Sequence, residues 1–235
     1  MRWTDTPIHI IDFEGSIASG ILEYGIVTLL GGGIAMTQTR LCRATGRVRD
    51  EDAALHGLTA GLVARCEPFA TAEEFSFFAR LRETGPLGAH FAHAENSLLK
   101  SAWPYPRRSP DFARGAAAGN GGNDANATTI DWGPWIDTGR LYAEIFPHSQ
   151  LETLQLESLV RVFDLQAGLD AIAAAQCPAN RRHYHAALYD ALASALLLIS
   201  LGRRAEFSEM TVPWLLQMSA GSAQKRDALR QEEMF

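Results

Sequence analysis

The stretch PIHIIDFEGS (residues 7–16) begins as an apolar strand and ends with two carboxylates, Asp12 and Glu14, only one residue apart. Side chains two positions apart on a strand point to the same face, so the two acids project together while Ile11 and Phe13 point the other way. Burying two neighbouring carboxylates is unfavourable without a compensating positive charge. A divalent cation such as Mg²⁺ or Mn²⁺ would supply that charge, because both prefer hard oxygen ligands. The alternative is an ordinary acidic strand end that meets water or an arginine.

Further strands are expected after this stretch. GILEYGIVTLL (20–30) is an apolar run, GGG (31–33) is a turn, and IAMTQTRLC (34–42) alternates apolar and polar residues. The short connections predict that these strands pair in antiparallel fashion. GPLGAHFA (85–92) predicts a short strand, and residues 129–146 predict another that leads into a helix.

Helices are expected at 49–59, 71–83, 93–102, 154–165 and 182–201. The helix at 71–83 begins with a capping box, in which Thr71 caps and Glu74 follows three residues later. The segment at 182–201 is the most apolar and is expected to be the final core helix.

We expect one domain over residues 1–235, with a flexible insertion at about 103–129 and a C-terminal extension from about 203. The insertion is rich in Gly, Ala, Asn and Pro. The arginines and aromatic residues of this insertion either contact a nucleic-acid backbone or belong to a solvated loop. These residues are Trp103, Tyr105, Arg107, Arg108 and Arg114. The apolar residues of the extension either pack on the core, as we expect, or bind a partner protein. These residues are Trp214, Leu215, Leu216 and Met218.

The composition predicts a soluble protein of the cytoplasm that does not associate with membranes. The formal net charge of −6 argues against nucleic-acid binding by bulk positive charge, although a few arginines could still hold a strand locally. The three cysteines are widely spaced and match no zinc pattern, which fits a reducing compartment. The polar beginning of the chain, with Asp5, predicts no secretory signal, and the apolar run at 186–202 is too interrupted to cross a bilayer.

The stretch HYHAALYD (183–190) places His185 five residues before Asp190. Five helical residues turn through roughly 500°, which leaves two side chains about 140° apart. We therefore expect His185 at or before the helix start and Asp190 in the first turns. An imidazole titrates near neutrality, so His185 could act as a general base, with His183 as a competing candidate. The alternative is a surface histidine and a solvated aspartate.

Together these segments resemble the DnaQ-like 3′–5′ exonuclease family of the DEDDh type, within the ribonuclease H-like superfamily. The resemblance covers about residues 10–200 without the insertion, and it rests on IIDFEGS, ILEYGIVTL with its Glu23-x-Gly25-x-Val27 pattern, ALHGLT (54–59), WIDTGRLY, LETLQLESLVRVFDL and HAALYD. Several spaced motifs in the same order are far more specific than any one of them.

The resemblance implies a mixed five-stranded α/β sheet, with its first three strands antiparallel and helices on its flanks. It implies two divalent ions, Mg²⁺ or Mn²⁺, roughly 3.5–4 Å apart, with His185 as the base. The implied metal ligands are Asp12, Glu14, Glu95 and Asp190, and the implied substrate-binding residues are Phe13, Gly15, Ser16, His56 and His90. The implied reaction removes nucleoside 5′-monophosphates from the 3′ end of DNA or RNA, most readily from a single strand. A homodimer or a replication or repair partner would be compatible with it.

The chain departs from the family pattern at its second motif, HFAHAENSLL (90–99). Glu95 stands where the family has a metal-binding Asp, and Phe91 and Ala94 replace Asn and Phe. Glu95 either serves as the third acid, as we expect, or marks a weakened site whose fold is kept for binding nucleic acid or protein. A hydrolase for small nucleotides is a further alternative. Gly15 and Ser16 replace the Thr-Thr that often follows the first acids, which bears on the contacts with a terminal nucleotide.

Overall fold

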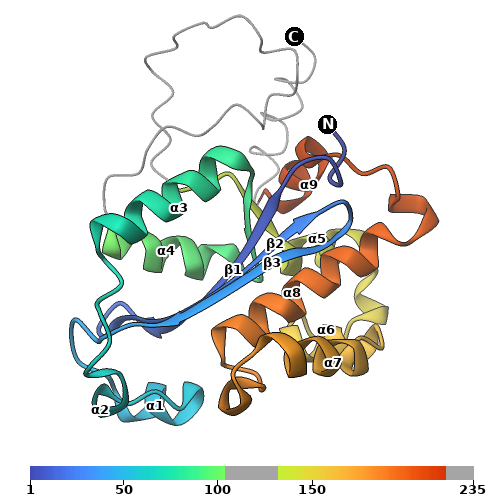
Figure 1. Ribbon diagram of the computed structural model, residues 1–235. Helices are drawn as coiled ribbons and strands as arrows, with labels where there is room; N and C mark the ends of the chain where they lie inside the picture. The colour runs from blue at the N-terminus through green and yellow to red at the C-terminus, as the bar shows by residue number, and fades with distance from the viewer. Residues whose placement is uncertain (104–131, 221–235) are drawn as a thin grey trace, which may run out of the picture.

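A computed structural model describes residues 1–103 and 132–220, and its described part is built around a five-stranded sheet in the order β3-β2-β1-β4-β5 (Figure 1). The strands are β1 (Ile8–Ser16), β2 (Gly20–Leu30), β3 (Gly33–Leu41), β4 (Leu87–Ala89) and β5 (Trp135–Asp137). The first three are antiparallel neighbours, whereas β4 runs parallel to β1 and β5 parallel to β4. The expected five-stranded mixed sheet, with its first three strands antiparallel and helices on its flanks, is confirmed.

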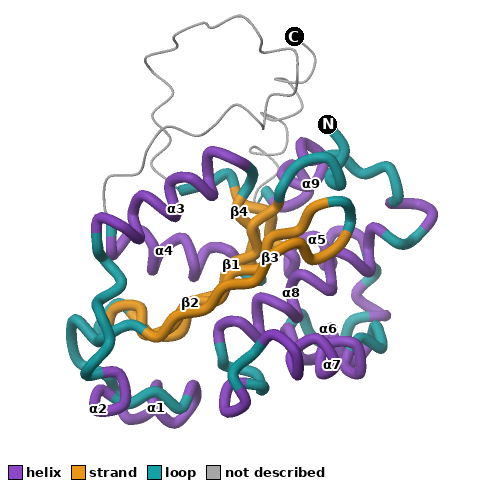
Figure 2. The backbone as a smooth tube through the Cα atoms, viewed as in Figure 1, coloured by secondary structure: helices purple, strands orange, loops and turns teal. Residues whose placement is uncertain are grey.

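The helices form two layers on this sheet, as Figure 2 shows. They are α1 (Asp50–His56), α2 (Ala60–Val63), α3 (Ala72–Thr84), α4 (Ala92–Ala102), α5 (Thr138–Ile145), α6 (Leu156–Val162), α7 (Gln166–Gln176), α8 (Ala187–Gly202) and α9 (Val212–Ser219). One core cluster joins Ile11 and Phe13 of β1 to α3 and α4. A second joins Ile8 and Ile10 of the same strand to α5–α9. Asp12 continues the alternation of Ile8 and Ile10, so the acids of β1 lie on the α8 face of the sheet.

The turn between β1 and β2 requires glycine at position 15. The pairing register shifts between Glu14 and Gly15, which marks an irregularity at the strand end. Gly15 has a φ of +131°, and a Cβ there would lie 2.3 Å from the carbonyl oxygen of Gly20. A side chain at this position would therefore clash with the opposite strand. Ser16 and Ser19 close the turn through hydrogen bonds between their hydroxyls and backbone amides.

Several predicted boundaries are wrong. The apolar helix begins at Ala187 rather than 182, because His185 adopts a positive φ of 62° and cannot be part of an α-helix. The helix expected at 154–165 ends at Val162, since Asp164 also has a positive φ of 53°. Helices α2, α7 and α9 were not expected, so α8 is not the final helix of the core.

Helix α9, in the described part of the C-terminal extension, packs on the core, as expected. Leu215 and Leu216 of α9 are buried, and Trp214 and Met218 pack against the same cluster. Trp103 packs on Phe69 and other aromatic rings of the α3–α4 layer. The other residues of the predicted insertion that we singled out, Tyr105, Arg107, Arg108 and Arg114, lie outside the described residues.

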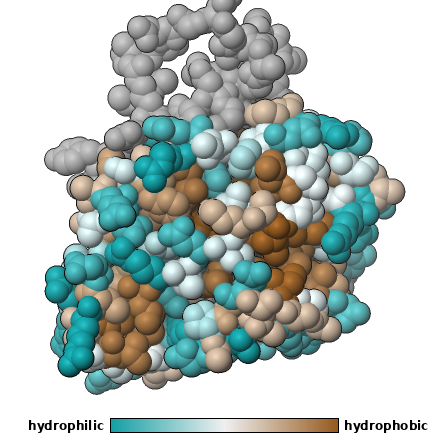
Figure 3. All heavy atoms as spheres, viewed as in Figure 1, coloured by the Kyte–Doolittle hydropathy of each residue, from teal (hydrophilic) through white to brown (hydrophobic). Residues whose placement is uncertain are grey.

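The described surface carries both polar and apolar side chains (Figure 3). An apolar region at the lower left of that view lies where Figure 1 places α1 and α2, and Leu55 and Leu62 of these helices are exposed. Among the described residues no helix has the length and apolar character needed to cross a membrane.

Candidate metal centre and active site

Three predicted site residues converge at the end of β1. One ligand atom each from Glu14, His185 and Asp190 lies within 4.8 Å of the other two. Glu14 comes from β1, Asp190 from the first turn of α8, and His185 from the loop just before that helix. Both carboxylates are buried, whereas His185 is exposed. The arrangement therefore combines two sheltered oxygen donors with an imidazole open to solvent.

Asp190 is anchored through one oxygen and open at the other. The backbone N–H of His185 donates to Asp190 Oδ2 at 2.9 Å. Asp190 Oδ1 is buried and has no hydrogen-bond partner among the described residues. A buried carboxylate oxygen that lacks a hydrogen-bond donor is suited to bind a cation, because the cation replaces the favourable interactions with water that the oxygen lost on burial. The oxygen donors present here therefore fit a hard divalent ion.

Asp12 and Glu95 lie next to the group of Glu14, His185 and Asp190 but are not part of it. Strand β4 pairs with β1 only as far as Ile10, so the edge of β1 is open beyond that point. There the N–H of Phe13 donates to Glu95 Oε2 at 2.9 Å, which brings a carboxylate of α4 to the backbone of β1. Glu95 is buried and Asp12 half-buried. The structure thus brings all four predicted acids to the end of β1, with Glu14 and Asp190 closest to His185.

The electrostatics of the site are those of several carboxylates held close together away from water. Burial, followed by Glu95 and Asp190, raises the pKa of Asp12 well above its usual range. Burial and then Asp190 raise the pKa of Glu14 to about 9. Burial raises the pKa of Glu95 to about 8 and that of Asp190 to about 7, each against the effect of its backbone hydrogen bond. These acids would release protons when a divalent ion binds, since a carboxylate must be deprotonated to act as a metal ligand.

A further buried acid, Glu23, faces Glu14 across the β1–β2 pair. Arg181 holds it through an ion pair and a second hydrogen bond of 3.2 Å from Nε to Oε1. The sequence motifs single out Glu23 only as part of the family pattern and do not single out Arg181. The signal for the arginine was Glu23 itself, because a carboxylate in an otherwise apolar strand needs a cationic or hydrogen-bonding partner.

The predicted substrate-binding residues differ in whether their side chains face the core or lie beside the acids. Phe13 has its ring in the α3–α4 core, against Phe69 and Phe78. Gly15 and Ser16 lie beside the acids in the half-buried turn after β1. The contacts of these three residues with a substrate stay predictions.

His56 and His90 are both held by the protein. His56 Nδ1 accepts a hydrogen bond from the N–H of Leu58, so the neutral ring carries its proton on Nε2. That buried Nε2 has no partner within the described part of the chain. In contrast, both ring nitrogens of His90 are engaged, by Thr138 Oγ1 at 2.9 Å and the carbonyl of Leu154 at 2.7 Å. His90 thus ties the end of β4 to α5 and to the loop before α6, while His56 retains a free donor.

No protein-family model matches the chain, and no curated protein matches its sequence. Solved structures do match. Exonuclease X in complex with 5′ overhanging duplex DNA is 20% identical over 91% of this chain and 99% of that one, with a TM-score of 0.60. The nuclease domain of 3′hExo, a DEDDh family member bound to rAMP, is 17% identical over 86% and 94%, with a TM-score of 0.53. E. coli Exonuclease I in complex with a dT13 oligonucleotide is 11% identical over 86% of this chain and 42% of that one, with a TM-score of 0.54.

These likenesses establish the fold, which is that of the DEDDh 3′-exonucleases, and the resemblance stated from the sequence motifs is confirmed at that level. The chain places an acid–histidine group at the end of its first strand, on the same fold as several nucleases.

Proposed function

We propose that this protein is a metal-dependent 3′–5′ exonuclease that removes nucleoside 5′-monophosphates from the end of a DNA or RNA strand. The observation that carries the proposal is the convergence of Glu14, His185 and Asp190 within 4.8 Å at the end of β1. The fold is shared with nucleases solved with DNA or with rAMP, which supports a nucleic-acid substrate. A single-stranded 3′ end and a place of action in the cytoplasm are part of the same proposal.

The carboxylates of Asp12, Glu14, Glu95 and Asp190 would hold the cations, and two Mg²⁺ or Mn²⁺ ions fit this number of oxygen donors. Ions bound there would neutralise the charge that develops on the phosphate and would acidify water. The buried acids keep their geometry through β1, α4 and α8, so the protein does not have to reorganise when the charge forms.

His185 is placed to accept a proton. Its ring is exposed beside the acids, so a proton taken from the attacking water can pass on to solvent. The water oxygen then bonds to phosphorus as the bond between phosphorus and the 3′ oxygen breaks. The products are a nucleoside 5′-monophosphate and a strand shortened by one nucleotide, whose 3′ oxygen takes up a proton. The buried Nε2 of His56 has no hydrogen-bond partner among the described residues, and this is the donor with which His56 would contact the substrate.

A second candidate is a weakened site on the same fold that binds nucleic acid or protein. The hydrogen bond from Phe13 to Glu95 favours it, because one oxygen of this acid is already occupied by the backbone. A phosphodiesterase for small nucleotides is the remaining alternative, and it differs from the first proposal only in the length of its substrate.

The test is degradation of 5′-labelled single-stranded DNA, duplex DNA and RNA in Mg²⁺, Mn²⁺ or EDTA. We expect stepwise shortening from the 3′ end, release of mononucleotides, and no reaction in EDTA. Asp12→Ala and Asp190→Ala should each reduce the rate at least about 1,000-fold, because each removes an oxygen donor from the site. Asp5→Ala, which changes an exposed aspartate that pairs with Arg2 before β1 begins, is the matched control. Full activity of either site variant would overturn the metal-ligand assignment, and dinucleotides cleaved in preference to long strands would favour the phosphodiesterase.

A further inference from the structure

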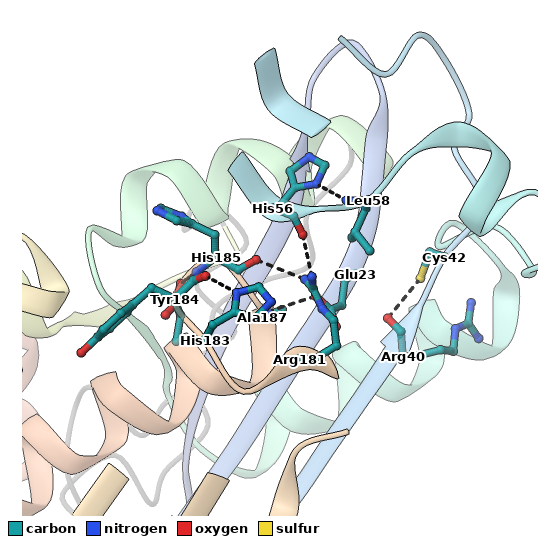
Figure 4. A network of polar contacts seen from close by, with 11 residues as sticks. Glu23, Arg40, Cys42, His56, Leu58, Arg181, His183, Tyr184, His185 and Ala187 are labelled. Atoms are coloured by element: carbon teal, nitrogen blue, oxygen red, sulfur yellow. Dashed lines mark hydrogen bonds and ion pairs between the residues drawn. The ribbon is translucent and has the colours of Figure 1, made fainter. Parts of the chain in front are cut away.

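Arg181 is a buried arginine that connects three separate segments of the chain beside the candidate active site (Figure 4). Its guanidinium is paired with the carboxylate of Glu23 on β2. It also donates from Nη1 to the carbonyl of His56 at 2.6 Å and from Nη2 to the carbonyl of His185 at 3.1 Å. One side chain therefore ties the end of α1 and the loop before α8 to the central sheet.

Glu23 completes the connection from the other side. Its Oε2 accepts a hydrogen bond from the N–H of Ala187 at 3.1 Å, in addition to the guanidinium of Arg181. The backbone is thus held to the ion pair at His185 and again at Ala187. Between these two anchors the chain enters α8, the helix that carries Asp190.

The conformation that this pair holds is one that the loop would rarely adopt alone. His185 has a φ of 62°, in the left-handed region that few residues other than glycine adopt. Such a conformation persists when surrounding contacts over-determine it. The contact of Arg181 with the carbonyl of His185 and that of Glu23 with the N–H of Ala187 contribute to that constraint.

We propose that the Arg181–Glu23 pair positions His185 over the acids, so that Arg181 is a positioning residue for the reaction. The proposal rests on the proposed function, since it assigns Arg181 a part in that same site. The guanidinium contacts the carbonyl of His185 and not its ring, so it acts on where the imidazole lies rather than on the substrate. Its planar fork of donors can serve Glu23 and two carbonyls at once, which an ammonium group cannot reproduce.

The test compares Arg181→Lys with Arg182→Lys. Lysine at 181 keeps the buried positive charge beside Glu23 but has fewer fixed donors. Arg182 is the neighbouring arginine and is exposed, and within the described part of the chain it donates to the carbonyls of Cys177 and Ala174 near the end of α7. Both substitutions therefore make the same chemical change in adjacent positions, and only the first alters the loop anchor.

We expect Arg181→Lys to lower kcat about 10- to 100-fold with KM changed less than about threefold, because a small misplacement of a reacting group slows the chemical step. Binding of Mn²⁺, measured by calorimetry, should stay within about threefold, since the acids remain. Hydrogen exchange at the amide of Ala187 should become faster. Arg182→Lys should match the wild type in all of these measurements.

An Arg181→Lys protein with the exchange rate and kcat of the wild type would overturn the proposal. So would an equal loss in the Arg182→Lys control, which would point to general destabilisation. A second variant, Glu23→Gln, keeps an acceptor for Ala187 but removes the ion pair, and it should lower kcat without a matching rise in KM. Absence of nuclease activity in the wild type would reject the proposed function, whereas the amide exchange would still decide whether Arg181 holds the loop.

Discussion

At the scale of single residues, the site is decided by where each side chain is anchored. Asp190 is anchored by the amide of His185 and keeps one oxygen free of hydrogen bonds within the described residues. Glu95 is anchored by the amide of Phe13, so the longer acid uses its extra methylene to reach the backbone of β1. The sequence motifs predicted which acids would lie close together. The hydrogen-bond donor to each carboxylate oxygen, in contrast, depends on the folded backbone.

Removing the imidazole of His185 should separate metal binding from turnover. We expect His185→Ala to retain Mn²⁺ binding within about threefold and to lose about 100- to 10,000-fold in kcat, because the proton acceptor is gone. Calorimetry and single-turnover degradation would measure the two effects. The control is His183→Ala, since His183 is exposed and contacts the carbonyl of Tyr184 rather than the acids. An unchanged rate for His185→Ala, or an equal loss for His183→Ala, would remove His185 from the reaction.

Glu95 offers a test of whether this acid holds a cation. Glu95→Gln keeps an oxygen that can accept from Phe13 but removes the negative charge, so we expect a folded protein whose Mn²⁺ affinity falls at least about tenfold. Glu95→Ala leaves the Phe13 amide without a partner and should reduce the free energy of unfolding by about 1–3 kcal/mol. Calorimetric titration and thermal unfolding measure these effects. Wild-type Mn²⁺ affinity in Glu95→Gln would assign Glu95 to the backbone alone and would favour the binding module.

At the scale of elements, the close contact between β2 and the beginning of α8 sets the position of Asp190. Gly25 of β2 lies against the backbone of Ala187, and a Cβ there would come within 2.3 Å of its carbonyl carbon. The Glu-x-Gly pattern on this strand thus has a physical basis. Glu23 binds the amide of Ala187 through its side chain, and Gly25 leaves room for the helix to approach.

Adding a methyl group at Gly25 should force these elements apart. We expect Gly25→Ala to lower the free energy of unfolding by about 1–3 kcal/mol, in line with other overpacked positions, and to reduce nuclease activity because α8 carries Asp190. Denaturant unfolding and the oligonucleotide assay check both effects. Gly168→Ala is the matched control, since no described atom lies within 4 Å of a Cβ at this position in α7. That change should stabilise the protein by up to about 1 kcal/mol; equal behaviour of the two variants would contradict the packing argument.

At the scale of the whole molecule, the site lies at the end of β1, where the helices on both faces of the sheet contribute residues. Asp12 lies on the α8 face of the sheet, and Glu95 arrives from α4 at the edge that β4 leaves open. The metal-free protein must hold these acids together within one low-dielectric region. Its stability should therefore depend on pH and on divalent cations more strongly than its net charge of −6 would suggest.

The direction of that dependence follows from the raised pKa values. Glu14 titrates at about 9 in the folded protein against 4.5 normally, so between these values the native state holds a proton that the unfolded chain has lost. Stability of the metal-free protein should accordingly fall as pH rises through this window. Added Mn²⁺ should raise the melting temperature, and more so at high pH, because the ligands bind it when deprotonated. Thermal unfolding at about pH 6 and pH 8.5, in EDTA or Mn²⁺, measures both.

The control for this titration is Glu14→Gln, which should show a flatter pH dependence in EDTA and a smaller response to Mn²⁺. A melting temperature that rises with pH in EDTA would contradict the assignment of raised pKa values to these acids. A response to Mn²⁺ that is equal in Glu14→Gln would show that the cation binds elsewhere.

The sequence alone determined the order of the strands along the chain, the acids of β1, and the position of His185 before the long apolar helix α8. These are local properties, since alternation of apolar residues and the geometry of a helix depend on neighbours in sequence. Only the tertiary structure decided that Glu95 binds the Phe13 amide, that Arg181 pairs with Glu23, and where α8 begins. Such contacts join residues up to 164 positions apart, and they depend on how the layers pack, which no local pattern encodes.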